Sequence, residues 1–467
     1  MTPRQPLMRE IAPIAPTEAL RAFEELGSLA FLDSGSNPSE LARWSFVAAD
    51  PFARFEIRKG QAFWQEEPIA GDAFSIFKNK FSHFTLEPLK NGPPLTSGAI
   101  GFFAYELGNH FESIPSMPKS RESEAELSFG FYDVVYAYDA LTKKSYLVSS
   151  GFPELDESRR LIRAEERLNL FEEKLKQQPR ALKNNPPVKD WRSNFTKDAY
   201  QAAVGEVIEA ILRGDIFQAN LSQCFTAVRP EAYDPLSFYL ALRDISPAPF
   251  GAYIESREAT YTSNSPERFL TLERNGQIEA RPIKGTARRS SDPTEDRALA
   301  HALLESEKDR AENTMIVDLL RNDLSRVAKT GSVRVPTLCG LETYANVHHL
   351  VSVIEATLKP EYDLFDLIRA TFPGGSITGA PKIKAMDIIA EQEKTPRGVY
   401  CGAMGYISFD GTMDLNIAIR TATFTQDEIR FSAGGGITAL SDPDSEHRET
   451  LVKAERLFKA FRYDEGE

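Results

Sequence analysis

The sequence is poor in cysteine and has no long apolar run. Its three cysteines, Cys224, Cys339 and Cys401, are too few and too scattered for a disulfide framework or a structural zinc site. No stretch of about 18 apolar residues is present that could span a bilayer. The N-terminus, Met1-Thr2-Pro3-Arg4-Gln5, lacks the apolar core of a signal peptide, and we therefore expect a cytoplasmic protein.

An excess of positive charge is also missing. The formal net charge of -13 argues against nucleic acid or an anionic membrane surface as a partner, so an anionic small substrate would need a local basic pocket. Neither a Walker loop nor a glycine-rich dinucleotide fingerprint occurs, and nucleotide binding is not expected. With 467 residues, 42% of them hydrophobic, the chain is long enough for two domains or one large domain.

A linker divides the sequence. Leu155 to Gln178 carries dense charge with apolar residues at helical spacing and predicts a solvated amphipathic helix. The run Asn184-Asn185-Pro186-Pro187 that follows is typical of a linker. We therefore divide the chain into an N-terminal region, residues 1–180, and a C-terminal region, residues 190–462.

A predicted hairpin carries a lysine in a setting suited to a nucleophile. Two strand-like runs, Arg268 to Arg274 and Gln277 to Ile283, flank Asn275-Gly276, a strong signal for a two-residue turn. That turn would place Glu267 directly opposite Lys284, with Cβ atoms about 5 Å apart. A carboxylate in this position can hold the ammonium or take its proton when the amine attacks.

A plain cross-strand ion pair between Glu267 and Lys284 explains the same pattern, and geometry alone favours it. Pro282 belongs at a sheet edge or a bulge, and a bulge would shift the register by one residue. The pattern therefore leaves open both the role of Lys284 and its pairing.

The segment Pro282-Ile283-Lys284-Gly285-Thr286 resembles the signature of the aminodeoxychorismate synthase large subunit (component I), within the chorismate-utilising anthranilate synthase component I family. In the related anthranilate synthase subunits the lysine position is typically alanine. The resemblance is strong over roughly the last 270 residues and weaker before them. It implies an α+β fold of two large, mostly antiparallel β-sheets packed as a sandwich, with helices outside and both halves contributing.

Two acidic helices are predicted in the C-terminal region. Asp292-Pro293-Thr294-Glu295 is a strong helix start, and the helix should continue to about Val327. Asp442-Pro443 opens a second helix near the C-terminus. The acidic rows are Asp309 and Glu312 in the first helix and Glu446 and Glu449 in the second, where Lys453 follows.

Carboxylates from two helices can hold a hard cation through oxygen ligands, although the same spacing is common on solvated faces. The resemblance implies that Glu312 and Glu449 are direct Mg²⁺ ligands and that Asp309 and Glu446 lie beside them. The family often has glutamate where this chain has Asp309, whose shorter side chain reaches less far.

Phe372 to Lys382 is a glycine-rich loop running into a helix that Pro381 would start, and backbone amides at such a start attract anions. A simple capping loop explains the pattern equally well. The resemblance implies that this segment borders the chorismate ring, with Ser376 at a substrate-contacting position and His349 as an active-site histidine.

Tyr400 to Phe409 and Thr412 to Phe424 predict a second hairpin around Asp410-Gly411. The resemblance assigns Tyr400 and Arg420 to a substrate carboxylate, which suits a guanidinium fork. A strict two-residue turn would place these two side chains on opposite faces, so the loop is longer, a bulge intervenes or the assignment fails.

The run Ala433-Gly434-Gly435-Gly436-Ile437 allows close approach of the backbone to a ligand, with a tight turn as the alternative. By resemblance, the Gly436 amide, Lys453 and Thr286 contact substrate. Isochorismate and salicylate synthases have a lysine base at the position that aligns with Gln218. The absence of that lysine here argues against water as the nucleophile.

Near the start of the chain, Phe31-Leu32-Asp33-Ser34-Gly35 is similar to the segment that lines an N-terminal tryptophan pocket in this family, which makes Ser34 a candidate regulatory residue. An ordinary edge strand and turn explains five residues at least as well.

Taken together, the resemblance implies a Mg²⁺-dependent transferase of folate and 4-aminobenzoate biosynthesis, which aminates chorismate to 4-amino-4-deoxychorismate through a covalent lysine intermediate. Ammonia would come from a glutamine amidotransferase subunit in a heterodimer, because no cysteine here has the Gly-x-Cys-x-Gly setting. The alternatives are an anthranilate synthase component I, a less favoured isochorismate or salicylate synthase, and a non-catalytic tryptophan-sensing subunit.

Overall fold

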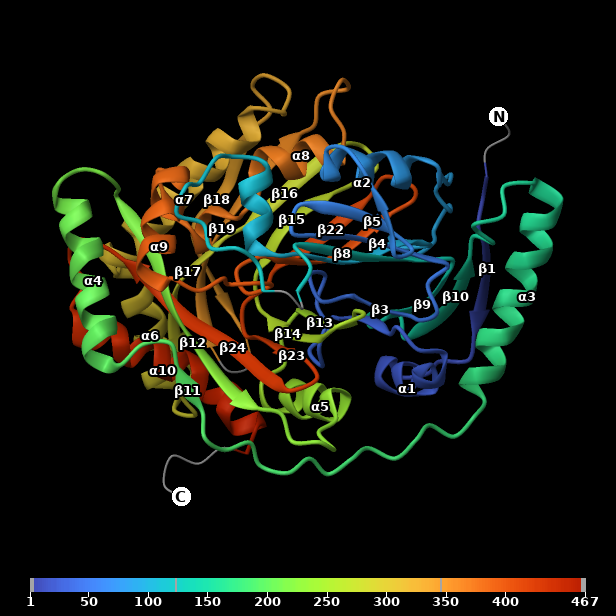
Figure 1. The fold of residues 1–467 in the computed structure, drawn as a ribbon, viewed down its shortest axis with the longest axis horizontal. Coiled ribbons are helices and arrows are strands. Elements are labelled where there is room, and N and C mark those ends of the chain that lie inside the picture. The colour runs from blue at the N-terminus through green and yellow to red at the C-terminus, as the bar shows by residue number, and fades with distance from the viewer. Residues whose placement is uncertain (1–3, 122–123, 345–346, 463–467) are drawn as a thin grey trace.

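The computed structural model describes residues 4–121, 124–344 and 347–462 (Figure 1). Within them the chain forms two large antiparallel sheets with helices outside, which confirms the predicted α+β class. The first sheet has the strand order β1 (Leu7–Ile11), β10 (Lys144–Ser149), β9 (Val134–Asp139), β3 (Trp44–Ala48), β2 (Ala30–Asp33), β13 (Phe250–Glu255), β14 (Thr260–Ser265), β23 (Thr421–Phe424), β24 (Glu428–Ile437), β12 (Gln218–Val228) and β11 (Arg192–Ser193), with β20 (Gly379–Ala380) also paired to β12.

The second sheet is also built from both ends of the chain. Its strand order is β17 (Ile283–Arg288), β19 (Val347–Thr357), β16 (Gln277–Arg281), β15 (Arg268–Leu272), β22 (Met413–Ile417), β21 (Ala403–Ser408), β7 (Gly98–Phe103), β8 (Leu127–Tyr132), β4 (Ala53–Arg58), β5 (Gln61–Trp64) and β6 (Glu67–Ile69), with β18 (Arg334–Thr343) paired to β19. In the first sheet β2 meets β13, and in the second β7 meets β21, so the two sequence regions share both sheets.

The sheets pack face to face through aromatic and aliphatic side chains. Phe46 on β3 meets Tyr406 on β21 with ring centroids 5.6 Å apart, and Phe102 on β7 meets Tyr261 on β14 at 4.4 Å. These contacts form the centre of the sandwich, and they bury apolar surface that would otherwise be hydrated.

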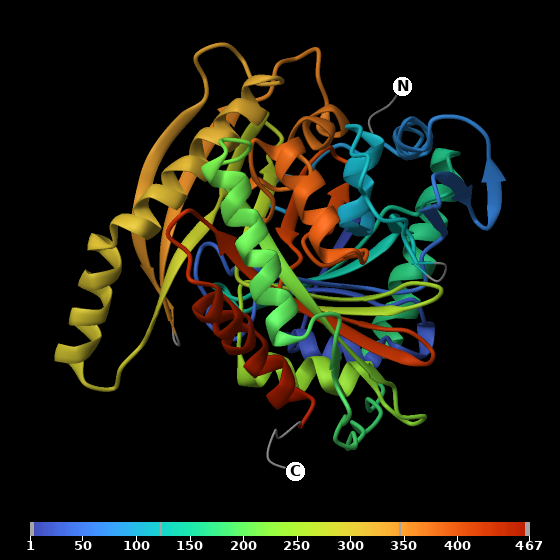
Figure 2. The same cartoon turned by 60° about the vertical axis from the view of Figure 1, so that its left-hand side comes forward.

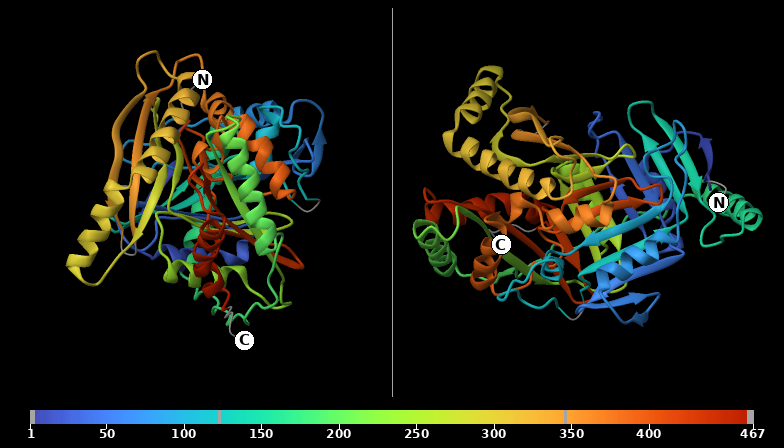
Figure 3. Two further views of the ribbon diagram at one scale, coloured as in Figure 1. Left: turned by 90° about the vertical axis from the view of Figure 1, so that its left-hand side faces the viewer. Right: turned by 90° about the horizontal axis from the view of Figure 1, so that it is seen from above.

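The helices lie outside the sheets (Figures 2 and 3), and several start at a side chain that accepts a backbone N–H. None of the described helices is long and apolar enough to cross a membrane. The helices are α1 (Pro16–Ala22), α2 (Ala73–Ser82), α3 (Glu157–Leu175), α4 (Lys197–Leu212), α5 (Pro235–Ile245), α6 (Pro293–Glu305), α7 (Glu307–Ser325), α8 (Leu364–Thr371), α9 (Lys382–Glu393) and α10 (Pro443–Ala460), with short 3₁₀ turns η1 (Glu24–Leu26), η2 (Tyr105–His110) and η3 (Gly375–Ile377).

The predicted helix from Asp292 to Val327 is two helices, α6 and α7. The start is as expected, because Asp292 accepts the backbone N–H groups of Thr294 and Glu295 at 2.7 and 3.2 Å. The chain then breaks at Ser306, whose hydroxyl accepts the N–H of Asp309 at 3.2 Å and caps α7. The cap therefore begins a new helix two residues before Asp309, the first residue of the acidic row.

The predicted two-residue turn at Asn275-Gly276 is a three-residue loop, and so is the turn at Asp410-Gly411, whose length the sequence left open. In the first, Glu273 N donates to Gln277 O at 2.8 Å and Gly276 N donates to Glu273 O at 2.9 Å. The second hairpin has the same pattern at Ser408 and Thr412, again with a glycine in the left-handed region at the third loop position. This is the geometry of a type I turn followed by a glycine bulge. The dipeptides Asn-Gly and Asp-Gly fit this three-residue loop as well as they fit a two-residue turn.

The run from Thr412 to Phe424 is not one strand. Its first part is β22 in the second sheet, and its second part is β23 in the first sheet. The chain crosses between the sheets just before β23, where Arg420 has φ +51°. The sequence pattern was misleading here because strands in both sheets are apolar, and periodicity does not reveal a change of sheet.

Candidate active site

Lys284 lies in an irregular part of β17. The register of β17 with β19 shifts between Ile283 and Thr286, so Lys284 and Gly285 occupy a bulge. Gly285 has φ +90°, and a Cβ there would lie 3.0 Å from Asp309 Cβ. A bulge redirects a side chain out of the regular alternation of a strand. The bulge and its glycine therefore set the direction of the lysine.

Glu267 is close to Lys284 but not directly opposite it, as the two-residue turn required. The pairing of β15 with β16 is shifted, and Arg268 faces Arg281. The Glu267 carboxylate accepts the Ser376 hydroxyl at 2.6 Å and the Ile283 N–H at 3.4 Å. Burial raises the pKa of Glu267 to about 7, while these hydrogen bonds and Lys284 act in the opposite direction.

The Lys284 amine lies among charged groups of both signs. Burial lowers its pKa, Glu312, Glu267 and Glu449 act to raise it, and Lys453 lowers it further. The structure therefore brings together the predicted nucleophile, its predicted base and carboxylates of the two predicted acidic helices. A lysine with a lowered pKa is available as a free amine nearer to neutral pH.

The four acidic residues from α7 and α10, Asp309, Glu312, Glu446 and Glu449, form what we call the acidic cluster. A Cβ added at Gly435 would lie 3.2 Å from Glu449 Oε1 and 3.4 Å from Glu446 Oε2, and one at Gly436 would lie 3.3 Å from Glu312 Oε2. The glycines of β24 thus leave room for three carboxylates to approach one stretch of backbone.

Lysines neutralise part of this cluster. Lys453 pairs with Glu449 at 2.6 Å and donates to Gly434 O at 3.0 Å, and Lys308 lies 3.7 Å from Glu446. In the part of the chain that the structure describes, no three carboxylate, imidazole or thiol groups are close enough to form a metal site as they stand. The cluster offers only oxygen donors, which fits Mg²⁺ or Ca²⁺ rather than a softer metal.

A smaller cavity of about 250 Å³ lies beyond His349, and we call it the arginine cavity. His349 Nδ1 and Thr286 Oγ1 are 2.9 Å apart, and burial lowers the pKa of His349 to about 3, so the ring is neutral at physiological pH. The residues of this lining used below are Ser34, Tyr344, His349, Arg420 and Arg456.

Tyr400 and Ser34, two further predicted site residues, lie in different surroundings. The Tyr400 ring is in the core, 5.9 Å from the Arg397 guanidinium, and it is not part of the arginine cavity as the structure describes it. Ser34 faces that cavity, and its hydroxyl is 2.9 Å from Ser45 Oγ. The pairing of Tyr400 with Arg420 on one substrate carboxylate therefore stays a prediction.

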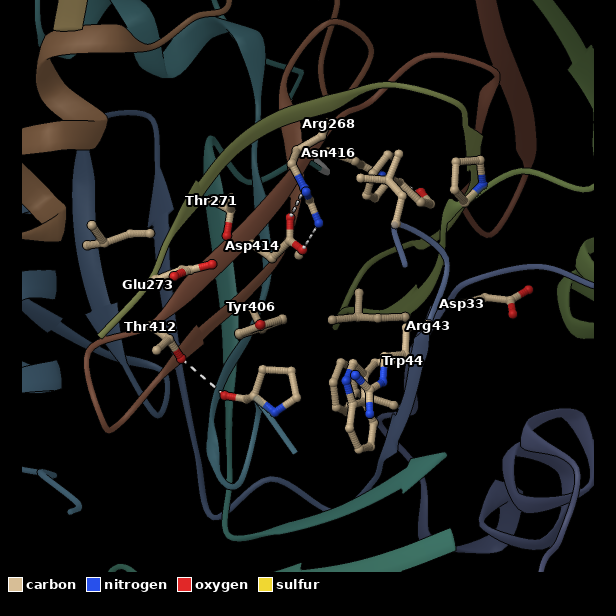
Figure 4. A pocket seen from close by; sticks show the side chains of 18 of the residues that line it. Asp33, Arg43, Trp44, Arg268, Thr271, Glu273, Tyr406, Thr412, Asp414 and Asn416 are labelled. Atoms are coloured by element: carbon tan, nitrogen blue, oxygen red, sulfur yellow. Dashed lines mark hydrogen bonds and ion pairs between the residues drawn. The ribbon is translucent and has the colours of Figure 1, made fainter. Parts of the chain in front are cut away.

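A larger cavity of about 500 Å³ lies next to β2 (Figure 4). Leu32, Asp33, Trp44 and Tyr406 are among the residues that line it. The Asp33 carboxylate is already paired with Arg243 at 2.6 Å. Strand β2 lies between β3 and β13, so the alternative of an ordinary edge strand is wrong.

Two basic residues near the site, Lys308 and Arg456, were not predicted from the sequence. Lys308 is near Glu446, and Arg456 shares the arginine cavity with Arg420. Arg456 continues the row of Glu446, Glu449 and Lys453 at helical spacing on α10, and extending that row by one turn would have found it. Lys308 directly precedes Asp309, the first residue of the acidic row of α7, and this position was the available signal in the sequence.

Comparison with known proteins identifies the family. Residues 29–459 match the family model of chorismate binding enzymes. The chain is 38% identical over 433 residues to aminodeoxychorismate synthase component 1 of Escherichia coli, covering 92% of each chain. It is 40% identical over 443 residues to anthranilate synthase component 1 of Aquifex aeolicus, covering 93% of this chain and 89% of that one.

Among solved structures, anthranilate synthase component I from Streptococcus pneumoniae superimposes with a TM-score of 0.80 at 31% identity, covering 91% of this chain and 93% of that one. This similarity confirms the two-sheet fold implied by the sequence. With a family model spanning most of the sequence and relatives of this identity over nearly their full lengths, the chain belongs to the family of chorismate binding enzymes.

Proposed function

We propose that the chain converts chorismate and ammonia into 4-amino-4-deoxychorismate, the precursor of 4-aminobenzoate in folate biosynthesis. Relatives of two activities are similarly close, so overall identity does not separate them. The observation that carries the proposal is the amine of Lys284, which lies in a bulge near Glu267 and the acidic cluster and has a lowered pKa.

The first step is a displacement by the lysine. Glu267 takes a proton from Lys284, and the free Nζ forms a bond to ring carbon C2. The two ring double bonds shift, the C4–O bond breaks, and the C4 hydroxyl leaves with a proton as water. A carboxyl whose pKa is raised to about 7 suits proton exchange near neutral pH.

The second step reverses the first with a new nucleophile. Ammonia bonds to C4, the double bonds shift back, and the C2–Nζ bond breaks, so that Lys284 is released after regaining its proton. In family members that use water as the nucleophile, a lysine base occupies the position that aligns with Gln218. The Gln218 amide is not a base and would not activate water. Two displacements at low barriers replace one difficult substitution.

The acidic cluster is the proposed site of Mg²⁺. Glu312 and Glu449 would hold the ion, with Asp309 and Glu446 beside them and Lys308 and Lys453 displaced from the carboxylates they now contact. The ion, when bound, supplies positive charge that neutralises the substrate ring carboxylate. Ser376, which binds Glu267, and the backbone of Gly436 would then contact the ring side of the substrate.

A separate glutamine amidotransferase subunit is the proposed source of ammonia. Burial raises the pKa of Cys401 to about 12, and the pKa of the Cys224 thiol is raised as well. Such thiols are poor nucleophiles, so neither suits glutamine hydrolysis. The heterodimer is thus part of the proposal, with ammonia from the partner displacing Lys284 from the ring.

The test is to incubate the purified chain with chorismate, Mg²⁺ and an ammonium salt, which replaces the partner, and to identify the product by mass spectrometry. Aminodeoxychorismate from the wild type and none from Lys284→Ala would support the proposal. Anthranilate from the wild type would overturn it and favour the anthranilate synthase activity.

A second candidate function is tryptophan binding, which the larger cavity favours. Its aromatic walls, Trp44, Phe46 and Tyr406, would stack on an indole, while polar groups at its rim would hold the amino-acid end. Ser34 belongs to the arginine cavity and is a weaker candidate for this site. Calorimetric titration with tryptophan tests the idea, and no heat or thermal shift at millimolar ligand would contradict it.

A further inference from the structure

Helix α10 connects the two ends of the site. Glu449 belongs to the acidic cluster, Lys453 follows one turn later, and Arg456 lines the arginine cavity. At 1.5 Å per residue, Glu449 and Arg456 are separated by about 10 Å along the helix. One helix therefore presents an anionic group at one end of the site and a cationic group at the other.

The arginine cavity holds two guanidinium groups, from Arg420 and Arg456, and among its described lining residues there is no carboxylate. Burial and the neighbouring charge of Arg456 lower the pKa of Arg420 to about 10. His349 in the same lining is neutral. Two like charges facing one small cavity repel each other until an anion enters between them.

Arg456 has only a modest structural contact. Its Nη1 donates to Ser246 Oγ at 2.7 Å, which occupies one of the five donors of a guanidinium. Its other donors make no hydrogen bond to a described residue, and Arg456 lines the same cavity as Arg420. A fork of this kind matches the two oxygens of a carboxylate.

We propose that Arg456 is a substrate-binding residue, which holds the carboxylate of the enolpyruvyl side chain together with Arg420. Chorismate carries one carboxylate on the ring and a second on the ether side chain. The acidic cluster with its cation takes the first, and the arginine cavity takes the second. The inference rests on the proposed function only in taking chorismate as the ligand, and it holds for amination and for anthranilate formation alike.

The cavity lies close enough to the chemistry to serve this role. His349 shares a hydrogen bond with Thr286 Oγ1. It also hydrogen-bonds the backbone of Gly285, the neighbour of Lys284 in the bulge. The wall of the cavity therefore continues directly into the strand that carries the nucleophile. If the enolpyruvyl side chain of the substrate is held there, the ring is fixed in position relative to Lys284 Nζ.

The experiment compares two inhibitors that differ in one carboxylate, 3-(1-carboxyethoxy)benzoate and 3-ethoxybenzoate, on the full chain with Mg²⁺. We expect Arg456→Gln to weaken the dicarboxylate by about 10- to 100-fold and to change the affinity of the monocarboxylate by less than about twofold. Arg456→Lys should restore part of the loss. Lys459→Gln, which removes an exposed positive charge from the same helix, is the matched control and should change neither affinity.

Equal weakening of both inhibitors by Arg456→Gln, or weakening of neither, would overturn the proposal, and so would a wild type that does not prefer the dicarboxylate. Because the readout is the ratio of two affinities for the same variant, partial unfolding cancels. Product identity does not enter the comparison, so a failure of the amination proposal would be visible separately.

Discussion

The acidic cluster and the arginine cavity are opposite solutions to binding an anion. In the cluster, carboxylates from α7 and α10 gather around the glycines of β24 and are partly neutralised by Lys308 and Lys453. In the cavity, two arginines lack a neutralising acid among the described lining residues. The first requires an added cation before it can accept a carboxylate, whereas the second can accept one directly.

This difference separates the two proposed carboxylate contacts of the substrate. Lys284 lies beside the acidic cluster, and Thr286 on the same strand contacts His349 of the arginine cavity. Because the two ends would act by different means, a substitution at one end should weaken one carboxylate contact and spare the other.

The largest expected effect comes from the proposed nucleophile, beside the acidic end of the site. Lys284→Ala should reduce amination by at least about 1,000-fold because the covalent step loses its nucleophile. The inhibitor affinities should remain within a few-fold, since both carboxylate sites persist. Steady-state assays with ammonium salt measure the first quantity and competition assays the second. Retained amination would show that ammonia attacks directly.

Glu312→Gln tests the acidic end. Loss of one proposed ligand should lower kcat/KM by about 10- to 100-fold and raise the Mg²⁺ concentration needed for half-maximal activity. Chelation of the wild type should give the same loss reversibly. Glu307→Gln, at the start of the same helix and exposed, is the control. An unchanged metal requirement in Glu312→Gln would contradict the assignment of the cluster.

Glu267→Gln tests the proton transfer. Because the pKa of Glu267 is about 7, we expect wild-type kcat/KM to fall as the pH drops below about 7, and this inflection should be absent in the variant. The raised pKa also means that folding favours the protonated carboxyl. Wild-type stability should therefore decrease relative to the variant as the pH rises from about 4.5 to about 7. Parallel pH profiles of activity for the two proteins would contradict the role.

Ser306→Ala should have the smallest effect. The hydroxyl caps α7, which carries Asp309 and Glu312, and its loss should cost about 0.5–2 kcal/mol of stability. Thr196→Ala removes a comparable cap from α4, which carries no residue of the site. Both variants should melt a few degrees earlier, but only Ser306→Ala should weaken Mg²⁺ binding. Equal metal affinities would mean that the cap does not position the cluster.

The sequence predicted well what depends on local chemistry. Asp292 and Asp442 start helices as expected, and α3 ends before the predicted linker. The glycines at 435 and 436 do face the predicted acidic residues. These features depend on residues near each other in sequence or on spacing along one helix.

What failed depends on long-range packing. The one-residue difference between a two-residue and a three-residue loop moved Glu267 away from the position facing Lys284, and the bulges in β15 and β17 changed the register again. The change of sheet before Arg420 could not be read from apolar residues. Arg456 became recognisable only when folding placed it across a cavity from Arg420.

The sharing of both sheets by the two ends of the chain also governs synthesis. Strand β7, at Gly98–Phe103, finds its partner β21 only when Ala403–Ser408 has been made. At 5–20 residues per second, about 15–60 s pass between the two. Throughout that time an apolar strand edge is open to other chains, which favours aggregation. The yield of the protein in cells should therefore respond to chaperone supply and translation rate more than its final stability would suggest.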